Sequence, residues 1–151
     1  DCSEILSKAK QKNVKVFLPE DVLCSNEFSD DGLKKVTDIY EVPEGWQGLD
    51  IGPKTMEKFE QVILGSSTIL WNGPMGVFEI PAFENGTHAV AKSVAKATQN
   101  GAYSLIGGGD SVAAIKKFNL QNQVSFISTG GGAMLESLEG KLLPGIKALS
   151  Q

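Results

Sequence analysis

Short apolar runs alternate with segments of helical periodicity along most of the chain. Apolar residues at helical spacing predict helices over residues 2–12, 53–64, 82–99, 111–118 and 133–140, with a turn or short helix over 142–149. Short apolar runs predict strands over residues 14–18, 68–72, 102–106 and 124–128. Repeated strand–helix pairs with nearly continuous apolar strands are typical of a parallel sheet covered on both faces. The sequence therefore predicts an α/β domain, a three-layer Rossmann-like fold with a mostly parallel sheet and helices on both faces.

The segment between residues 21 and 43 departs from this alternation. Residues 22–24 and 36–42 predict short strands, which we expect to pair antiparallel around a turn at residues 29–32. Residues 49–51 read as extended, and Pro53 stands where proline is tolerated, in the first turn of a helix.

Composition limits the classes of protein to consider. The 151 residues are 41% hydrophobic and 21% charged, which is typical of one soluble globular domain. No apolar run approaches the roughly 18 residues of a membrane span, and no secretory signal is visible, so we expect a cytoplasmic protein. The net charge of −4 is scattered, which argues against nucleic acid or membrane partners. Because the sequence does not begin with Met, we expect it to be part of a longer chain.

Three glycine clusters directly follow predicted strands. They are 73–76 (Gly-Pro-Met-Gly), the Gly-Gly-Gly run at 107–109 and a second such run at 130–132. Ligands of open parallel sheets bind beyond the carboxyl ends of the strands, and a glycine turn entering a helix lets an anion approach free N–H groups. Glycine also serves tight turns for conformational reasons alone, but two triple-glycine turns before helices favour phosphate binding. Neither a Walker A motif nor a complete G-x-G-x-x-G is present, which disfavours a P-loop enzyme or an ordinary NAD enzyme.

Four polar residues near these turns are candidates for ligand contacts. Asp110 would hold magnesium beside phosphates, or would only complement a helix dipole. Ser111 would donate to a phosphate or cap the same helix, and Asn72 would contact a ligand or serve the turn. Glu79 would accept hydrogen bonds from ribose, or is a solvated loop residue. His88 has no nucleophile or carboxylate partner in the sequence pattern, so we interpret it as structural.

Four longer strings resemble one known family. They are GWQGLDIGP (45–53), LWNGPMGVFE (70–79), IGGGDSVAA (106–114) and STGGGAMLESLEGKLLPGIKAL (128–149). In order and spacing these strings resemble signatures of phosphoglycerate kinase, and the resemblance covers essentially the whole chain. It implies that residues 1–151 are a truncated C-terminal, nucleotide-binding domain whose N-terminal substrate domain is absent. It also implies a monomeric glycolytic parent that reversibly transfers a phosphoryl group from 1,3-bisphosphoglycerate to MgADP, giving 3-phosphoglycerate and ATP.

The resemblance also implies roles for individual residues. Gly48 and Leu49 would border adenine, Pro74 and Val77 would pack on the nucleoside, and Glu79 would bind ribose. The phosphates would lie near Asn72 and be held by Gly108 to Ser111, with Asp110 coordinating Mg²⁺; Gly76 and Gly107 belong to the same nucleotide-binding set. The catalytic turn, facing the transferring phosphoryl group, would consist of Gly130, Gly131 and Gly132. Where the family often has threonine, this chain has Ser111, which retains the hydroxyl.

Other parts of the family's machinery have no counterpart in this sequence. The chain contains no Gly-Ala-Lys loop, so the family's phosphate-gripping lysines are absent, as are the phosphoglycerate site and catalytic arginine of the N-terminal domain. Since phosphoryl transfer depends on positioning and charge stabilisation, we expect little or no activity from this chain alone. The alternative is a stand-alone nucleotide-binding module without transferase activity. A dinucleotide-dependent oxidoreductase is the weaker third hypothesis.

Overall fold

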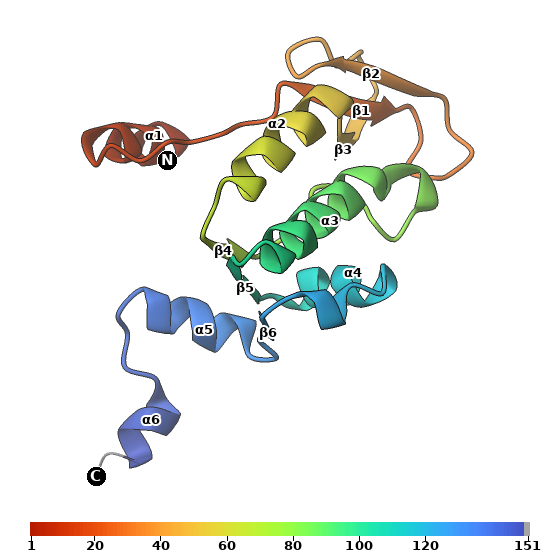
Figure 1. Cartoon of the computed structure of the whole chain (residues 1–151). Coiled ribbons are helices and arrows are strands. Elements are labelled where there is room, and N and C mark those ends of the chain that lie inside the picture. The colour runs from red at the N-terminus through yellow and green to blue at the C-terminus, as the bar shows by residue number, and fades with distance from the viewer. Residues whose placement is uncertain (150–151) are drawn as a thin grey trace.

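The computed structural model describes residues 1–149 and contains two small sheets with helices packed beside them (Figure 1). The strands are β1 (Asp21–Ser25), β2 (Lys34–Asp38), β3 (Gln47–Ile51), β4 (Thr68–Trp71), β5 (Tyr103–Ile106) and β6 (Phe126–Ile127). The α-helices are α1 (Cys2–Gln11), α2 (Pro53–Leu64), α3 (Asn85–Gln99), α4 (Gly109–Lys117), α5 (Gly131–Leu138) and α6 (Pro144–Leu149). Two single 3₁₀ turns, η1 (Pro81–Phe83) and η2 (Gln121–Gln123), precede α3 and β6. No helix within residues 1–149 is long and apolar enough to cross a membrane.

The strands form two sheets of different kinds. Strands β2, β1 and β3 make an antiparallel sheet in that order, which confirms the expected antiparallel strands in the 21–43 segment. Strands β4, β5 and β6 make a parallel sheet in sequence order. The prediction of an α/β fold with a parallel sheet is confirmed, and the antiparallel sheet adds a second unit beside it.

The main core lies on one face of the parallel sheet. Ile69 and Trp71 of β4 and Ile106 of β5 point to this face, where Val94 of α3 and Ile115 of α4 pack against them. Helix α2 lies against α3 and contributes partly buried apolar side chains to the same cluster (Figure 1). These three helices therefore hold the carboxyl ends of β4 and β5 in place, where the glycine turns begin.

The opposite face of the parallel sheet is much less covered. Leu70, Tyr103 and Phe126 lie on this face and are 44%, 53% and 55% exposed. Helices α1, α5 and α6 contain no buried residue. Within residues 1–149, the helix packing expected on both faces is thus concentrated on one of them.

One predicted strand is wrong. Residues 14–18 are extended but form no ladder, and Val14, Val16 and Leu18 are 57%, 44% and 54% exposed. The apolar run has strand propensity, but among the described residues no strand accepts its backbone hydrogen bonds. Smaller shifts affect boundaries: the expected helix over 82–99 divides into η1 and α3, and α4 and α5 each begin two residues before the predicted start.

A side chain from strand β1 caps the N-terminus of helix α2. Its N-cap residue, Gly52, has no side chain to accept from the helix, and the Asp21 carboxylate of β1 does so instead. The two oxygens of Asp21 accept from the N–H groups of Lys54 (3.0 Å) and Thr55 (2.8 Å), and the Thr55 hydroxyl donates as well (2.6 Å). Burial alone would raise the pKa of Asp21, but the hydrogen bonds from Thr55 and Lys54 outweigh it and hold this pKa below its ordinary value.

Asp21→Asn is expected to lower the free energy of unfolding at neutral pH by about 1–2 kcal/mol, because one amide oxygen replaces two accepting oxygens. Since the folded pKa is depressed, the contribution of Asp21 is fully present above its ordinary pKa of 3.8 and is lost as the pH falls through the lower folded value. Urea unfolding of both proteins across this acid range measures the effect. A difference in stability that does not shrink on acidification would contradict this role.

Candidate nucleotide-binding site

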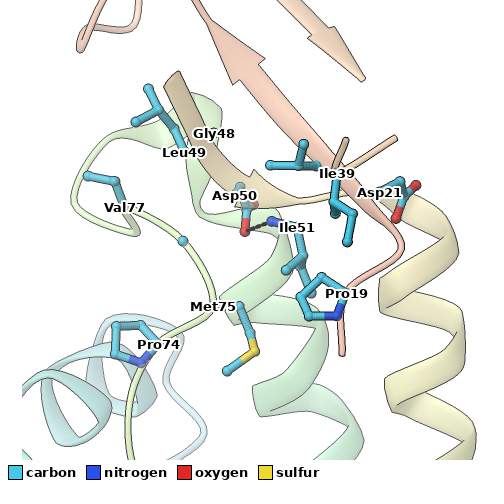
Figure 2. A pocket seen from close by; sticks show the side chains of 12 residues that line it. Pro19, Asp21, Ile39, Gly48, Leu49, Asp50, Ile51, Pro74, Met75 and Val77 are labelled. Carbon is cyan, nitrogen blue, oxygen red and sulfur yellow. Dashed lines mark hydrogen bonds between the residues drawn. The ribbon is translucent and has the colours of Figure 1, made fainter. Parts of the chain in front are cut away.

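An open pocket of about 420 Å³ lies between the antiparallel sheet and the loop after β4 (Figure 2). Its volume is within the range typical of small-molecule sites. Five residues of the predicted nucleotide-binding set line it together: Gly48, Leu49, Pro74, Gly76 and Val77. Two segments separated by more than twenty residues are thereby brought to one cavity, as the resemblance implies.

Backbone hydrogen bonds hold the two walls of this pocket together. The N–H of Val77 donates to the carbonyl of Leu49 at 2.9 Å, which links the loop directly to β3. From α3, the buried Thr87 hydroxyl accepts from the N–H groups of Met75 (3.1 Å) and Gly76 (3.3 Å). The loop over residues 74–77, called the pocket wall below, is therefore fixed from two sides.

Glycine is required where the pocket's elements pack most closely. A Cβ on Gly48 would lie 2.7 Å from Cγ2 of Val22, and one on Gly76 would lie 2.3 Å from Oδ1 of Asp50. These glycines therefore let neighbouring segments approach more closely than a side chain would permit.

The glycine turns meet at the carboxyl edge of the parallel sheet. Gly108 has a φ of +84°, and a Cβ there would come within 2.3 Å of the Asn72 amide oxygen. A Cβ on Gly131 would come within 2.4 Å of the backbone nitrogen of Gly108. The turns after β4, β5 and β6 are thus in direct contact, which brings Asn72, the 107–109 run and the 130–132 run together.

Two predicted phosphate contacts, Ser111 and Asp110, have different surroundings. Ser111 is fully buried, and its Oγ accepts from the N–H of Gly73 at 2.6 Å, so it ties α4 to the loop after β4. Asp110 is exposed, and its carboxylate makes no hydrogen bond or ion pair with any residue between 1 and 149. Helix α4 has no side-chain cap, so N–H groups of its first turn remain available to an anion.

The donor set fits a magnesium ion carried by a nucleotide. No group of three or more potential metal-ligating side chains occurs among the described residues, so a protein-built cage is not present there. Magnesium instead commonly uses one or two carboxylates together with phosphate oxygens and water. A free carboxylate beside an uncapped helix N-terminus, as at Asp110, matches that pattern.

Glu79 and His88 lie outside the pocket lining. Glu79 is exposed at the far end of the loop, next to Phe78, whose carbonyl accepts from Lys117 Nζ at 2.6 Å. His88 stacks on Phe118 with ring centroids 4.4 Å apart, and burial lowers its pKa, with the nearby charge of Lys92 acting in the same direction. This packing supports the structural interpretation of His88.

Comparison with known proteins assigns the chain to a family. A sequence model described as phosphoglycerate kinase matches residues 1–141. The chain belongs to the phosphoglycerate kinase family. The phosphoglycerate kinases of Porphyromonas gingivalis and Thermosipho africanus are 51% and 54% identical to it over 97% of the chain. The structure of phosphoglycerate kinase from Coxiella burnetii matches 93% of the chain with a TM-score of 0.87 and 48% identity.

The chain is much shorter than the phosphoglycerate kinases it matches. It covers 35% of the Porphyromonas protein, 37% of the Thermosipho protein and 36% of the Coxiella chain. The chain therefore corresponds to about a third of the length of these phosphoglycerate kinases.

One residue that lines the pocket, Asp50, was not predicted from the sequence. Asp50 lies in the GLDIG string and is 3% exposed, yet it lines the pocket and contacts the pocket wall. A carboxylate directly after two residues assigned to adenine was a visible signal in the sequence. Its contacts with residues 76 and 86 arise from tertiary packing and could not be inferred from spacing.

Proposed function

We propose that this chain supplies the Mg-nucleotide site of a phosphoglycerate kinase, as most of a C-terminal domain whose substrate-binding partner domain is not among these residues. The observation that carries the proposal is the family match over residues 1–141, which includes every glycine turn. The complete enzyme transfers a phosphoryl group between 1,3-bisphosphoglycerate and MgADP, giving 3-phosphoglycerate and ATP, and is a monomeric cytoplasmic protein of glycolysis that binds neither nucleic acid nor membranes.

The adenine and ribose occupy the pocket between β3 and the pocket wall. Leu49 and Val77 supply apolar contact. Gly48 and Gly76 carry no side chain, so both sides of the pocket leave room for the base. Glu79 lies outside the pocket lining, exposed at the end of the same loop, and accepts from the ribose hydroxyls at the edge of the pocket. This part of the site selects the nucleoside and orients it.

The phosphates lie over the three glycine turns. Backbone N–H groups of residues 108–111 face them at the N-terminus of α4, and Asn72 lies beside the same turn. Asp110 holds the nucleotide's magnesium, which neutralises phosphate charge when bound. The turn formed by Gly130, Gly131 and Gly132 faces the transferred group, where Gly132 has no heavy atom within 4 Å of a Cβ position.

The chain does not hold every charge that phosphoryl transfer needs. All 14 of its basic residues are lysines, and no arginine is present. Because this transfer is catalysed by positioning and by charge stabilisation, the chain by itself is expected to be inactive. The missing cations come from segments outside the 151 residues.

A chimeric enzyme tests the proposal. This chain replaces the matching 146 residues of the Porphyromonas gingivalis phosphoglycerate kinase, and ATP formation from 1,3-bisphosphoglycerate and ADP is measured. We expect the chimera to make ATP, the isolated chain to make none, and the chimera with Asp110→Asn to lose most activity. A folded chimera without activity would contradict the proposal.

A further inference from the structure

Asp50 is a buried carboxylate of the pocket, and it has no role in the nucleotide site as proposed above. It is 3% exposed in β3 and lines the same cavity as the pocket wall (Figure 2). Its Oδ2 accepts from the N–H of Gly86 at 2.7 Å, and its Oδ1 accepts from the N–H of Ile51 at 2.9 Å. Burying a carboxylate without a neighbouring cation costs free energy, so hydrogen bonds must compensate for the lost hydration.

The carboxylate lies where three segments meet. A Cβ on Gly76 of the pocket wall would come within 2.3 Å of Oδ1, and a Cβ on Gly86 of α3 would come within 2.2 Å. Helix α3 has no cap from its own N-cap residue, Glu84, so Asp50 satisfies one of its free N–H groups. The same helix carries Thr87, whose hydroxyl accepts from the wall.

We propose that Asp50 is a positioning residue of the nucleoside pocket: by holding the N-terminus of α3 against β3, its ionised carboxylate fixes the pocket wall at the distance that fits a nucleoside. The inference rests on the proposed function, because it concerns the same pocket. Asp50 acts through Gly86 and Thr87 on the wall, and it needs no contact with the nucleotide.

The charge on Asp50 makes this role dependent on pH. Burial raises its pKa to about 6, against the opposing effect of the hydrogen bonds from Gly86 and Ile51. Protonation removes the negative charge and turns one of the two oxygens into a hydroxyl, which is a weaker acceptor for its N–H donor, so we expect the wall to loosen below that pH. Among the titratable side chains of the neighbouring elements, Asp21 caps α2, Glu84 pairs with Lys117 and Glu79 is exposed. His88 of α3 stacks on Phe118, and its pKa is lowered by burial below the ordinary value of 6.5, so it also changes charge in this range. The Asp50→Asn variant retains His88 and therefore separates the two groups.

Binding of adenosine between pH 5 and 8 tests the inference, because adenosine has no phosphate that would titrate. In the unsubstituted chain we expect the affinity to fall several-fold as the pH drops through about 6. Asp50→Asn is expected to bind about tenfold more weakly at pH 8, with little further change at lower pH. Asp31→Asn, an exposed carboxylate in the turn between β1 and β2, serves as the matched control and should behave like the unsubstituted chain.

A second measurement needs no ligand and compares the unsubstituted chain with Asp50→Asn. The backbone amide resonances of Gly86 and Met75 in the unsubstituted chain should titrate together with a midpoint near pH 6, since one contact moves both segments. Resonances that stay constant over this range, or an adenosine affinity that is equal in Asp50→Asn and the unsubstituted chain, would overturn the positioning role. If adenosine binds to no variant while both amides titrate in the unsubstituted chain and not in Asp50→Asn, the proposed function fails and the link between Asp50 and the wall stands.

Discussion

Replacing Gly131 with alanine is expected to lower the free energy of unfolding by about 2–3 kcal/mol, in the upper part of the range for overpacked sites. The added Cβ would meet the backbone nitrogen of Gly108 at 2.4 Å and its Cα at 2.8 Å. These are backbone atoms of a turn with a φ of +84°, so no side-chain rotation relieves the contact. One of the two glycine turns must move, and the proposed phosphate site is distorted with it.

Gly132→Ala is the matched control, because Gly132 belongs to the same turn and no heavy atom outside its chain neighbours and its own helix backbone lies within 4 Å of its Cβ position. It should leave stability unchanged or raise it by up to about 1 kcal/mol, since alanine is the better helix former in α5. Urea unfolding of both variants measures the difference. Equal stabilities would mean that the turns after β5 and β6 are not packed against each other.

Asp110→Asn is expected to weaken binding of ADP in the presence of magnesium by at least about tenfold. The carboxylate is exposed and unpartnered among residues 1–149, so the substitution removes a negative charge without breaking an internal contact. The neutral amide oxygen is a weaker magnesium ligand, whereas contacts with the nucleoside and the backbone N–H groups remain. Stability should therefore be preserved while the magnesium-dependent part of affinity is lost.

Calorimetric titration with ADP, with magnesium and with a chelator instead, distinguishes these contributions. With the chelator, Asp110→Asn and the unsubstituted chain should bind ADP alike, and Asp31→Asn should match the unsubstituted chain throughout. An Asp110→Asn protein that keeps the full gain in affinity from magnesium would show that the ion is held elsewhere.

The parts of the fold set by local sequence patterns were predictable. The amphipathic run of α2, its Pro53 start and the apolar runs of β4 and β5 are confirmed at nearly the predicted residues. The triple-glycine runs identified the turns at the carboxyl edge, because each run follows an apolar strand and precedes a helix. Residues 48, 49, 74, 76 and 77 of the predicted nucleotide-binding set line one pocket.

What could not be predicted depends on contacts distant in sequence. Residues 14–18 have the composition of a strand, but a strand also needs a partner, and none is present within residues 1–149. The capping of α2 by Asp21 and of α3 by Asp50 joins residues 34 and 36 positions apart, which no local spacing reveals. Ser111 was expected to bind phosphate or cap its helix, whereas in the structure its hydroxyl accepts from Gly73 across the site.

We propose that the pocket beside β3 and the glycine turns at α4 form one Mg-nucleotide site. Residue-resolved amide spectra of the 151-residue chain, recorded as MgADP is added, test it most directly. We expect the shifts to concentrate in residues 48–51, 74–77 and 107–111, and we expect that omitting magnesium removes mainly those around Asp110. Shifts confined to other parts of the chain, or no shifts at concentrations that saturate ordinary nucleotide sites, would contradict it.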